Sequence, residues 1–264
     1  MASTMPEQYD PEANIGLEGE ENNERKPVRV ISSGEFVHIG ETKVYKRELL
    51  AAFAGTLNPQ IHTAPSRKFA NPSPMGLCAF ALTTFVLSLI NVRARHVTVP
   101  NIVVGLAFFY GGLVQLIAGL WEVVVENTFG ATALASFGAF WLSYGAIQTD
   151  SFGIISAYGD NTDELNSALG FFLIGWFIFT FILVLCTLRS TVAFFALFFF
   201  LDLTFLLLAC ASFTGHEGIN KAGGWAGIIT SFIAWYNAFA GIANSENFFF
   251  NVRPVPMPFS KKIV

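Results

Sequence analysis

Long apolar segments dominate this chain from Gly76 onward, and short polar segments separate them. Each apolar segment is close to the ~20 residues that a helix needs to cross the ~30 Å hydrocarbon core of a bilayer. Helices on the surface of a soluble protein would show a polar face, which these segments lack. The sequence therefore predicts an all-α integral membrane protein with six transmembrane helices. The predicted helices are 76–92, 101–125, 130–149, 166–188, 191–213 and 222–244.

The overall composition agrees with a membrane protein. Of the 264 residues, 53% are hydrophobic and only 13% are charged, whereas soluble domains average about 25% charged residues. So few charged side chains cannot cover the surface of a soluble enzyme, and the net charge of -4 offers no basic surface for a nucleic acid. We therefore expect membrane lipids around the protein and no nucleic-acid partner.

Charged residues are concentrated before Asn71. Residues 1–70 hold 10 acidic and 8 basic side chains, which is more than half of all the charged residues. Low hydrophobicity combined with mixed charge is typical of disordered segments. We therefore predict a cytoplasmic, mostly disordered tail over 1–70, in which 47–54 could form one short helix. A six-helix transport domain then covers 71–247, and a short cytoplasmic tail covers 248–264.

The distribution of Lys and Arg predicts the orientation of the helices. Six crossings place both termini on one side of the membrane, and the tails and loops on that side hold 12 basic residues. The opposite loops hold 3. Because basic residues favour the cytoplasmic side, both termini are predicted to be cytoplasmic. Arg67, Lys68 and Arg253 lie close to predicted helix ends and favour the same orientation.

Two polar stripes interrupt the apolar helices, where an unpaired amide or carboxyl group is costly. Gln115 and Glu122 are seven residues apart on a face of small residues, so both are predicted to point into the bundle. Gln115 could bond to another helix or to a solute, and Glu122 could instead reach the membrane interface. Thr230, Asn237 and Asn244 repeat the same spacing, which indicates either a water-facing wall or a chance pattern.

Two further features concern carboxylates. Asp202 lies at the centre of the fifth predicted helix, where its carboxyl group must be paired, protonated or turned toward water. A structural hydrogen bond and a transport role remain equally open for it, and Asp202 and Glu122 are the candidates for proton coupling. The segment Asn71–Gly76 begins the first helix with two prolines, which suit a helix start. Its free amide groups form either a simple cap or an anion site.

The sequence contains no motif of an enzyme or of a cofactor site. It lacks HExxH, GxSxG, a phosphate-binding Gly-rich loop followed by Lys, and a cysteine pair at metal-binding spacing. All four histidines lie outside the predicted helices. We therefore expect no catalytic residues, no cofactor, no metal and no histidine relay within the membrane.

Several motifs resemble those of the acetate uptake transporter family, which includes bacterial succinate-acetate permeases and fungal acetate and ammonium-export-related transporters. Asn71–Leu77 reads NPSPMGL and resembles the NPAPLGL signature of that family. The other matching blocks are FYGGLVQLIAGLWE at 109–122, NTFG at 127–130, SFGAFW at 136–141, AGGW at 222–225 and AWYN at 234–237. These blocks cover nearly the whole predicted membrane domain. The polar tail and the block at 164–176 resemble the fungal branch in particular.

The resemblance implies a plasma-membrane homohexamer in which each protomer has its own substrate path with an apolar constriction. The family forms this constriction from Phe, Tyr and Leu, which correspond to Phe80, Phe137 and Leu201 here. Phe137 replaces the family tyrosine and so removes a hydroxyl group from the narrowest ring. The residues assigned to the substrate path or to anion binding are Asn71, Tyr110, Gln115, Thr230 and Asn237.

The resulting hypothesis is membrane transport of acetate and similar short monocarboxylates, through a channel or a proton-coupled permease. Rings of Phe and Leu penalise a bare carboxylate and favour small or protonated acids. Two alternatives stay open. The protein could export ammonium or ammonia, as names within the fungal branch suggest, or it could be an acetate-responsive membrane sensor or scaffold with little flux.

Overall fold

The computed structural model describes residues 30–52, 69–249, 252 and 254–258 of the chain. The chain divides into two compact units, Met1–Lys68 and Phe69–Val264, which are treated separately here. The basic residues Arg67, Lys68 and Arg253, used above to predict orientation, lie outside the described residues.

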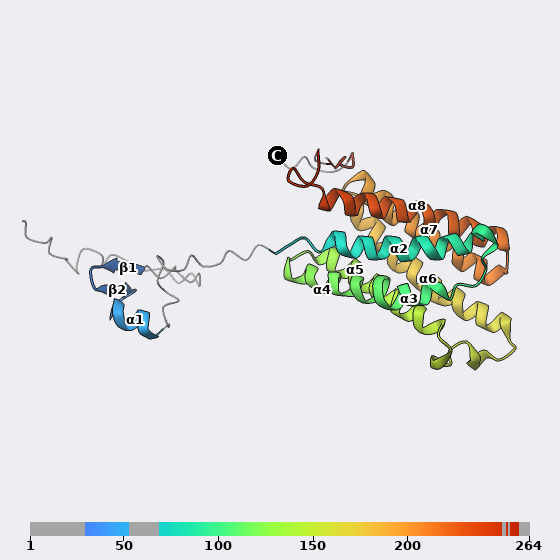
Figure 1. Ribbon diagram of the computed structural model, residues 1–264, viewed down its shortest axis with the longest axis horizontal. Coiled ribbons are helices and arrows are strands. Elements are labelled where there is room, and N and C mark those ends of the chain that lie inside the picture. Colours follow the sequence, from blue (N-terminus) through green and yellow to red (C-terminus); the bar gives the residue numbers. More distant parts are fainter. Residues whose placement is uncertain (1–29, 53–68, 250–251, 253, 259–264) are drawn as a thin grey trace, which may run out of the picture. The chain divides into compact units, whose positions relative to one another are not determined.

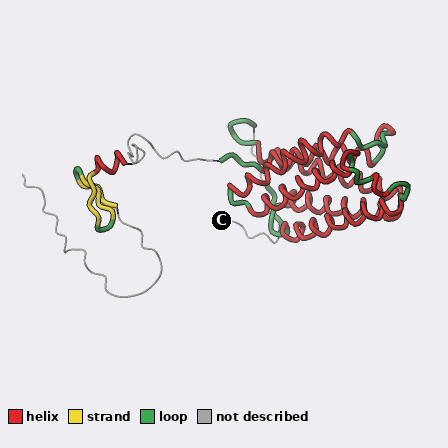
Figure 2. The backbone as a smooth tube through the Cα atoms, turned by 90° about the horizontal axis from the view of Figure 1, so that it is seen from below, coloured by secondary structure: helices red, strands yellow, loops and turns green. Residues whose placement is uncertain are grey.

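The described part of the first unit is a small antiparallel sheet followed by one short helix (Figure 2). Strand β2 pairs with β1 and with β3, and two-residue turns at Gly34 and Gly40 connect them. Both glycines have positive φ, as tight hairpin turns require. The elements are β1 (Val30–Ser33), β2 (Phe36–Ile39), β3 (Thr42–Tyr45) and α1 (Lys46–Ala52).

This sheet differs from the mostly disordered tail predicted from the sequence. Its strands have only four residues each, too short for an alternating apolar pattern to stand out among the surrounding charges. A cross-strand aromatic pair joins them, with the rings of Phe36 and Tyr45 4.4 Å apart. The short helix expected at 47–54 corresponds to α1, while residues 1–29 and 53–68 lie outside the described residues.

The second unit is a bundle of long helices that run alongside one another (Figure 1). Helix α2 packs against α8 and against the α3–η2–α4 segment, while α6 and α8 both pack against α7. The helices are α2 (Ser73–Asn91), α3 (Ile102–Phe108), the π-helical η2 (Phe109–Val114), α4 (Gln115–Val124), α5 (Thr128–Ile147), α6 (Thr162–Thr187), α7 (Val192–Thr214) and α8 (Glu217–Ile242). Short 3₁₀ turns η1 (Ala94–His96), η3 (Asp150–Phe152) and η4 (Ser156–Tyr158) lie in the connections.

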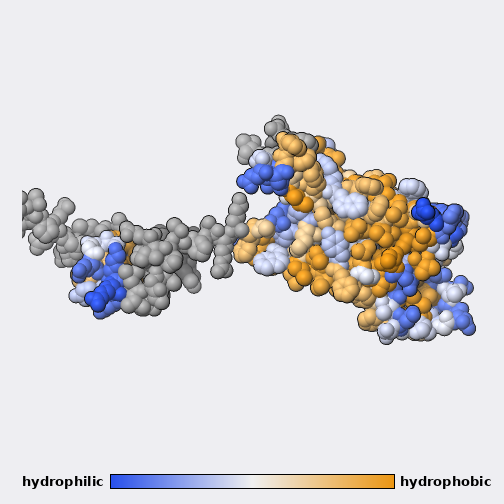
Figure 3. All heavy atoms as spheres, in the orientation of Figure 1, coloured by the Kyte–Doolittle hydropathy of each residue, from blue (hydrophilic) through white to orange (hydrophobic). Residues whose placement is uncertain are grey.

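Five helices among the described residues are long and apolar enough to cross a membrane: α2, the continuous segment Ile102–Val124, α6, α7 and α8. Helix α5 corresponds to the third predicted span, 130–149, and has 20 residues, but its Gly, Ser and Thr residues lower its hydropathy. Apolar side chains cover most of the visible face of the bundle, and hydrophilic ones gather toward its ends (Figure 3). The protein is thus a multi-helix membrane protein, as the sequence predicted.

Side-chain caps explain why two helices begin earlier than predicted. The Asn161 Oδ1 accepts a hydrogen bond from the Glu164 N–H at 3.1 Å, and the His216 Nδ1 accepts one from the Gly218 N–H at 3.1 Å. These caps satisfy amide groups that the helix itself leaves free. They extend α6 and α8 by about one polar turn beyond the apolar segments that the sequence analysis recognised.

Glycines allow neighbouring helices of the bundle to approach closely. A Cβ on Gly119 would lie 2.3 Å from the Ala135 backbone nitrogen, and one on Gly138 would lie 2.7 Å from that of Leu116. Helix α4 therefore contacts α5 backbone to backbone, as is common where lipid removes the hydrophobic drive for association.

We expect Gly119→Ala to destabilise the bundle, because the added methyl group meets backbone that cannot rotate away. The cost should be about 1–3 kcal/mol, as in other overpacked contacts. Thermal unfolding of the purified protein in detergent measures it. Gly105→Ala is the matched control, since a Cβ there has no neighbour within 4 Å. Equal melting temperatures for the two variants would contradict this packing.

Candidate functional site: an aromatic barrier between two cavities

Two cavities lie at opposite ends of the same four helices, α2, α5, α6 and α7. The first, here called the Arg93 vestibule, has a volume of about 340 Å³ and lies between the C-terminal ends of α2, α5 and α7 and the N-terminal ends of α6 and α8. The second, here called the Ser73 vestibule, has a volume of about 310 Å³ and lies at the other end of these helices. Its lining includes Ser73, Asn127, Ser190 and Phe194.

Aromatic side chains separate the two cavities. On α5, Leu134 lines the Ser73 vestibule and Phe140 lines the Arg93 vestibule. These residues are six positions apart, or ~9 Å along a helix. Phe137 lies between them and is 3% exposed. A buried apolar layer about two helical turns thick, here called the barrier, therefore lies between the two cavities.

Phe137 is the centre of this barrier. Its ring stacks on Phe205, a residue of the Arg93 vestibule, at 6.2 Å, and contacts Phe198, a residue of the Ser73 vestibule, at 6.4 Å. Three more rings surround it at 5.6 to 6.1 Å. These belong to Phe80, Trp176 and Phe179.

The other two constriction residues taken from the sequence lie in the same cluster. Leu201 is 3% exposed and lies between Phe198 and Phe205 on α7. Phe80 is 5% exposed and lies on α2 opposite Phe137. The structure thus brings Phe80, Phe137 and Leu201 into one apolar core between the vestibules. No hydroxyl group stands at Phe137, so this part of the barrier offers a solute only ring surfaces.

Gln115 lies at the same height as this barrier. It follows the π-helical turn η2 on a segment antiparallel to α2, where Gly111 faces Thr83 and Ala118 faces Gly76. Gln115 is 1% exposed, and its Oε1 has no hydrogen-bond partner among the described residues. A buried acceptor in this state is rare and costly, and π-helical turns are frequent at functional sites. The Oγ1 of Thr84 and the Nε1 of Trp141 are buried and unpartnered in the same sense.

Glu122 is buried at a junction of three helices beside the Ser73 vestibule. It is 1% exposed, and its carboxylate accepts hydrogen bonds from the Ser73 hydroxyl and, at 2.6 Å, from the Asn127 Nδ2. Asn127 also caps α5 by accepting a bond from the Gly130 N–H at 3.0 Å. Glu122 therefore joins the end of α4 to the beginnings of α2 and α5.

Asn71 supports this junction. Its Oδ1 accepts a hydrogen bond from the Ser73 N–H at 3.1 Å, which fixes the residue that donates to Glu122. The anion site considered at the start of the first helix is thus adjacent to a carboxylate of the protein itself. In this structure the side-chain donors Ser73 and Asn127 are engaged by Glu122.

The residues of the second predicted stripe, Thr230, Asn237 and Asn244, have separate roles. Thr230 is fully buried and donates to the Ala226 carbonyl at 2.9 Å, within its own helix. Asn237 donates to the Ile233 carbonyl at 2.8 Å and to the Ala193 carbonyl of α7 at 3.3 Å. Asn244 lies beyond the end of α8, where its Oδ1 caps a turn. The stripe therefore ties α8 to α7 and to its own backbone rather than forming a wall that faces water.

Tyr110 and Asp202 are both partly exposed on the protomer surface. Tyr110 belongs to the π-helical turn, and Asp202 lies midway along α7. One carboxylate oxygen of Asp202, Oδ1, is buried and has no hydrogen-bond partner in the described part of the protomer. Neither residue lines one of the two vestibules.

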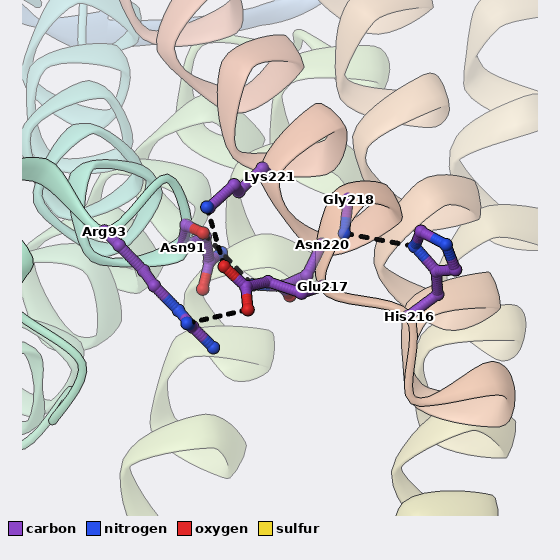
Figure 4. A network of polar contacts seen from close by, with 7 residues as sticks. All are labelled: Asn91, Arg93, His216, Glu217, Gly218, Asn220 and Lys221. Atoms are coloured by element: carbon purple, nitrogen blue, oxygen red, sulfur yellow. Dashed lines mark hydrogen bonds and ion pairs between the residues drawn. The ribbon is translucent and has the colours of Figure 1, made fainter.

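The sequence analysis did not single out the polar network at the rim of the Arg93 vestibule. Arg93 and Lys221 approach the Glu217 carboxylate from opposite sides, at 2.8 Å and 2.6 Å (Figure 4). Asn220 donates to the Asn91 carbonyl at 3.1 Å and so joins α8 to the end of α2. Asn91 and Arg93 are far from Glu217, Asn220 and Lys221 in the sequence, and the charges of Arg93 and Lys221 had served only to predict orientation.

A family model described as the GPR1/FUN34/yaaH family matches residues 53–259 of the chain. The chain belongs to the GPR1/FUN34/yaaH family. Its relatives in this family include Ammonia transport outward protein 2 of Saccharomyces cerevisiae, 57% identical over 231 residues, 88% of this chain and 82% of that protein. Acetate permease A of Emericella nidulans is 48% identical over 256 residues, 93% of this chain and 83% of that protein.

The fold also resembles a solved structure of the family, that of the bacterial acetate channel SatP. The two share 35% sequence identity with a TM-score of 0.63, over 71% of this chain and 99% of that chain. The family inferred from the NPSPMGL motif and its companion blocks is thereby confirmed.

Proposed function

We propose that the protein carries acetate and similar short monocarboxylates across a membrane, along a path within each protomer. The observation that carries this proposal is the pair of vestibules separated by the Phe80, Phe137 and Leu201 barrier. A short apolar barrier suits a small acid that has lost its hydration or its charge. The names of Acetate permease A and the acetate channel SatP support the choice of substrate.

The unpartnered buried polar atoms at the barrier are the proposed contacts for the solute. The Gln115 Oε1 needs a donor, which the hydroxyl of an undissociated acid supplies. Glu122 and Asp202 remain the candidates for proton coupling, and Tyr110 remains a candidate for the path. The proposed assembly is a plasma-membrane homohexamer of six-span protomers with cytoplasmic termini. Each protomer would cross the membrane with α5 in addition to the five long apolar helices named above. Asp202 would face a neighbouring protomer.

Ammonia export is the second candidate, favoured by the name of Ammonia transport outward protein 2. Neutral ammonia also crosses apolar barriers, and its N–H groups would suit the free acceptor of Gln115. An acetate-responsive sensor with little flux is the third candidate, because family membership alone does not establish a rate.

Purified full-length protein in liposomes separates these candidates. We expect it to accelerate the entry of labelled acetate above that of protein-free liposomes, with saturation at high concentration. Acetate entry that responds to an imposed membrane potential at equal pH indicates an anion channel, whereas entry that does not respond to the potential indicates movement of acetate together with a proton. Background acetate flux together with rapid ammonia movement, followed by an internal pH dye, would replace the acetate proposal with ammonia export.

A further inference from the structure

We infer that the Arg93 vestibule is an electrostatic capture site for carboxylate anions at this end of the path. This inference rests on the proposed transport of monocarboxylates. Among the described residues that line the vestibule, Arg93 is the only Lys, Arg, Asp or Glu. Asn91, Gln148 and Asn220 line it as well and add amide groups around the arginine.

The charge of the rim network favours anions. Glu217 shares its carboxylate between Arg93 and Lys221, so two cations meet one anion and the network keeps one net positive charge. The three side chains are between 42% and 47% exposed, so a solute can reach them from water. Figure 4 shows the guanidinium extending past the carboxylate, with only one of its nitrogens engaged.

The acidic residues at this end of the bundle lie elsewhere. Asp150 is in η3, and Asp160, Asp163 and Glu164 precede or begin α6; all four are exposed and none lines the vestibule. The Ser73 vestibule has the opposite character, because its described lining contains no Lys or Arg and the Glu122 carboxylate lies directly behind its Ser73 and Asn127. The path is therefore electrostatically asymmetric.

The floor of the vestibule is apolar. Phe140 and Phe205 form it, with their rings 5.2 Å apart. An anion held at Arg93 is thus concentrated at the point where it must lose its charge or its water to proceed. Clefts lined by one sign of charge raise the local concentration of a counter-ion in this way.

Charge-neutralising substitutions in the full chain test this inference through KM for labelled acetate in proteoliposomes. Arg93→Gln should raise KM about 2- to 5-fold, the range for a half-exposed charge in salt solution, with a maximal rate close to wild type. Arg93→Lys should keep KM near wild type. Glu217→Gln should lower KM, because it removes the anion that competes for Arg93. Higher ionic strength should weaken the wild-type affinity and leave Arg93→Gln nearly unaffected.

Arg95→Gln is the matched control, since Arg95 lies two residues away, is exposed and does not line the vestibule. If the network only holds the loop in place, Arg93→Gln and Glu217→Gln should change transport in the same direction, and that result would overturn the inference. So would an unchanged KM for Arg93→Gln. Absence of acetate flux in the wild-type protein would instead reject the proposed function itself.

Discussion

Glu122→Gln is expected to destabilise the protein substantially more than any neighbouring exposed substitution. The Glu122 carboxylate accepts from Ser73 and from Asn127 at a buried junction of α2, α4 and α5. An amide keeps the bond from Asn127 through its oxygen and turns its N–H₂ toward Ser73, whose hydroxyl must rotate to accept, so that both bonds lose the charge that strengthens them. Hydrogen bonds to buried charged groups contribute about 1.5–3 kcal/mol each, so the loss should be of that order, and Glu122→Leu should lose roughly twice as much.

Chemical or thermal unfolding in detergent measures both variants. Glu126→Gln is the matched control, because Glu126 lies four residues later and is exposed. Its effect should stay within about 0.5 kcal/mol, as for most surface changes. If Glu122→Gln were as stable to unfolding as Glu126→Gln but lost acetate flux, Glu122 would be a transport residue and not a structural one.

Leu201→Ala is expected to open the barrier to larger monocarboxylates such as lactate. Leu201 is buried between Phe198 and Phe205, the α7 residues that line the two vestibules. Removing its branched end should relieve a steric penalty of about 1–3 kcal/mol for a solute larger than acetate. A relief of this size corresponds to a roughly 5- to 150-fold rise in labelled lactate entry.

The same variant should keep acetate entry within a few-fold of wild type while losing about 2–5 kcal/mol of stability, as other buried Leu→Ala changes do. Leu185→Ala is the control, since Leu185 is 52% exposed on α6. Lactate entry unchanged in Leu201→Ala, with a normal amount of folded protein in the liposomes, would show that Leu201 does not narrow the path.

The helices of the membrane unit could be predicted because each is a nearly unbroken apolar segment. Their ends could not, since caps such as Asn161 and His216 extend α6 and α8 into polar sequence. Strands β1 to β3 were missed because four-residue strands depend on turn glycines and on one aromatic pair. Composition over a long window averages such short-range signals away.

Part of the candidate site could also be predicted from the sequence, and part could not. Motif similarity supplied Phe80, Phe137 and Leu201, and a spacing of seven residues indicated that Gln115 and Glu122 point inward. The hydrogen-bond partners of these residues could not be predicted from the sequence, because Ser73 contacts Glu122 only after α2 and α4 pack together. The Asn127 cap was the one readable signal, since Asn is a preferred residue at a helix start. From the sequence, Arg93 was interpreted only as a basic residue of a loop.

The barrier around Phe137 also affects how readily free protons leak across the membrane. Protons cross membranes rapidly along chains of hydrogen-bonded water, and a packed cluster of five rings around Phe137 leaves no hydroxyl there to continue such a chain. Under the proposed function, an acid can therefore cross while free protons and small ions are held back. Protons would then cross only as part of an acid molecule, so that proton entry through this path follows the supply of acid and stops when the acid is absent.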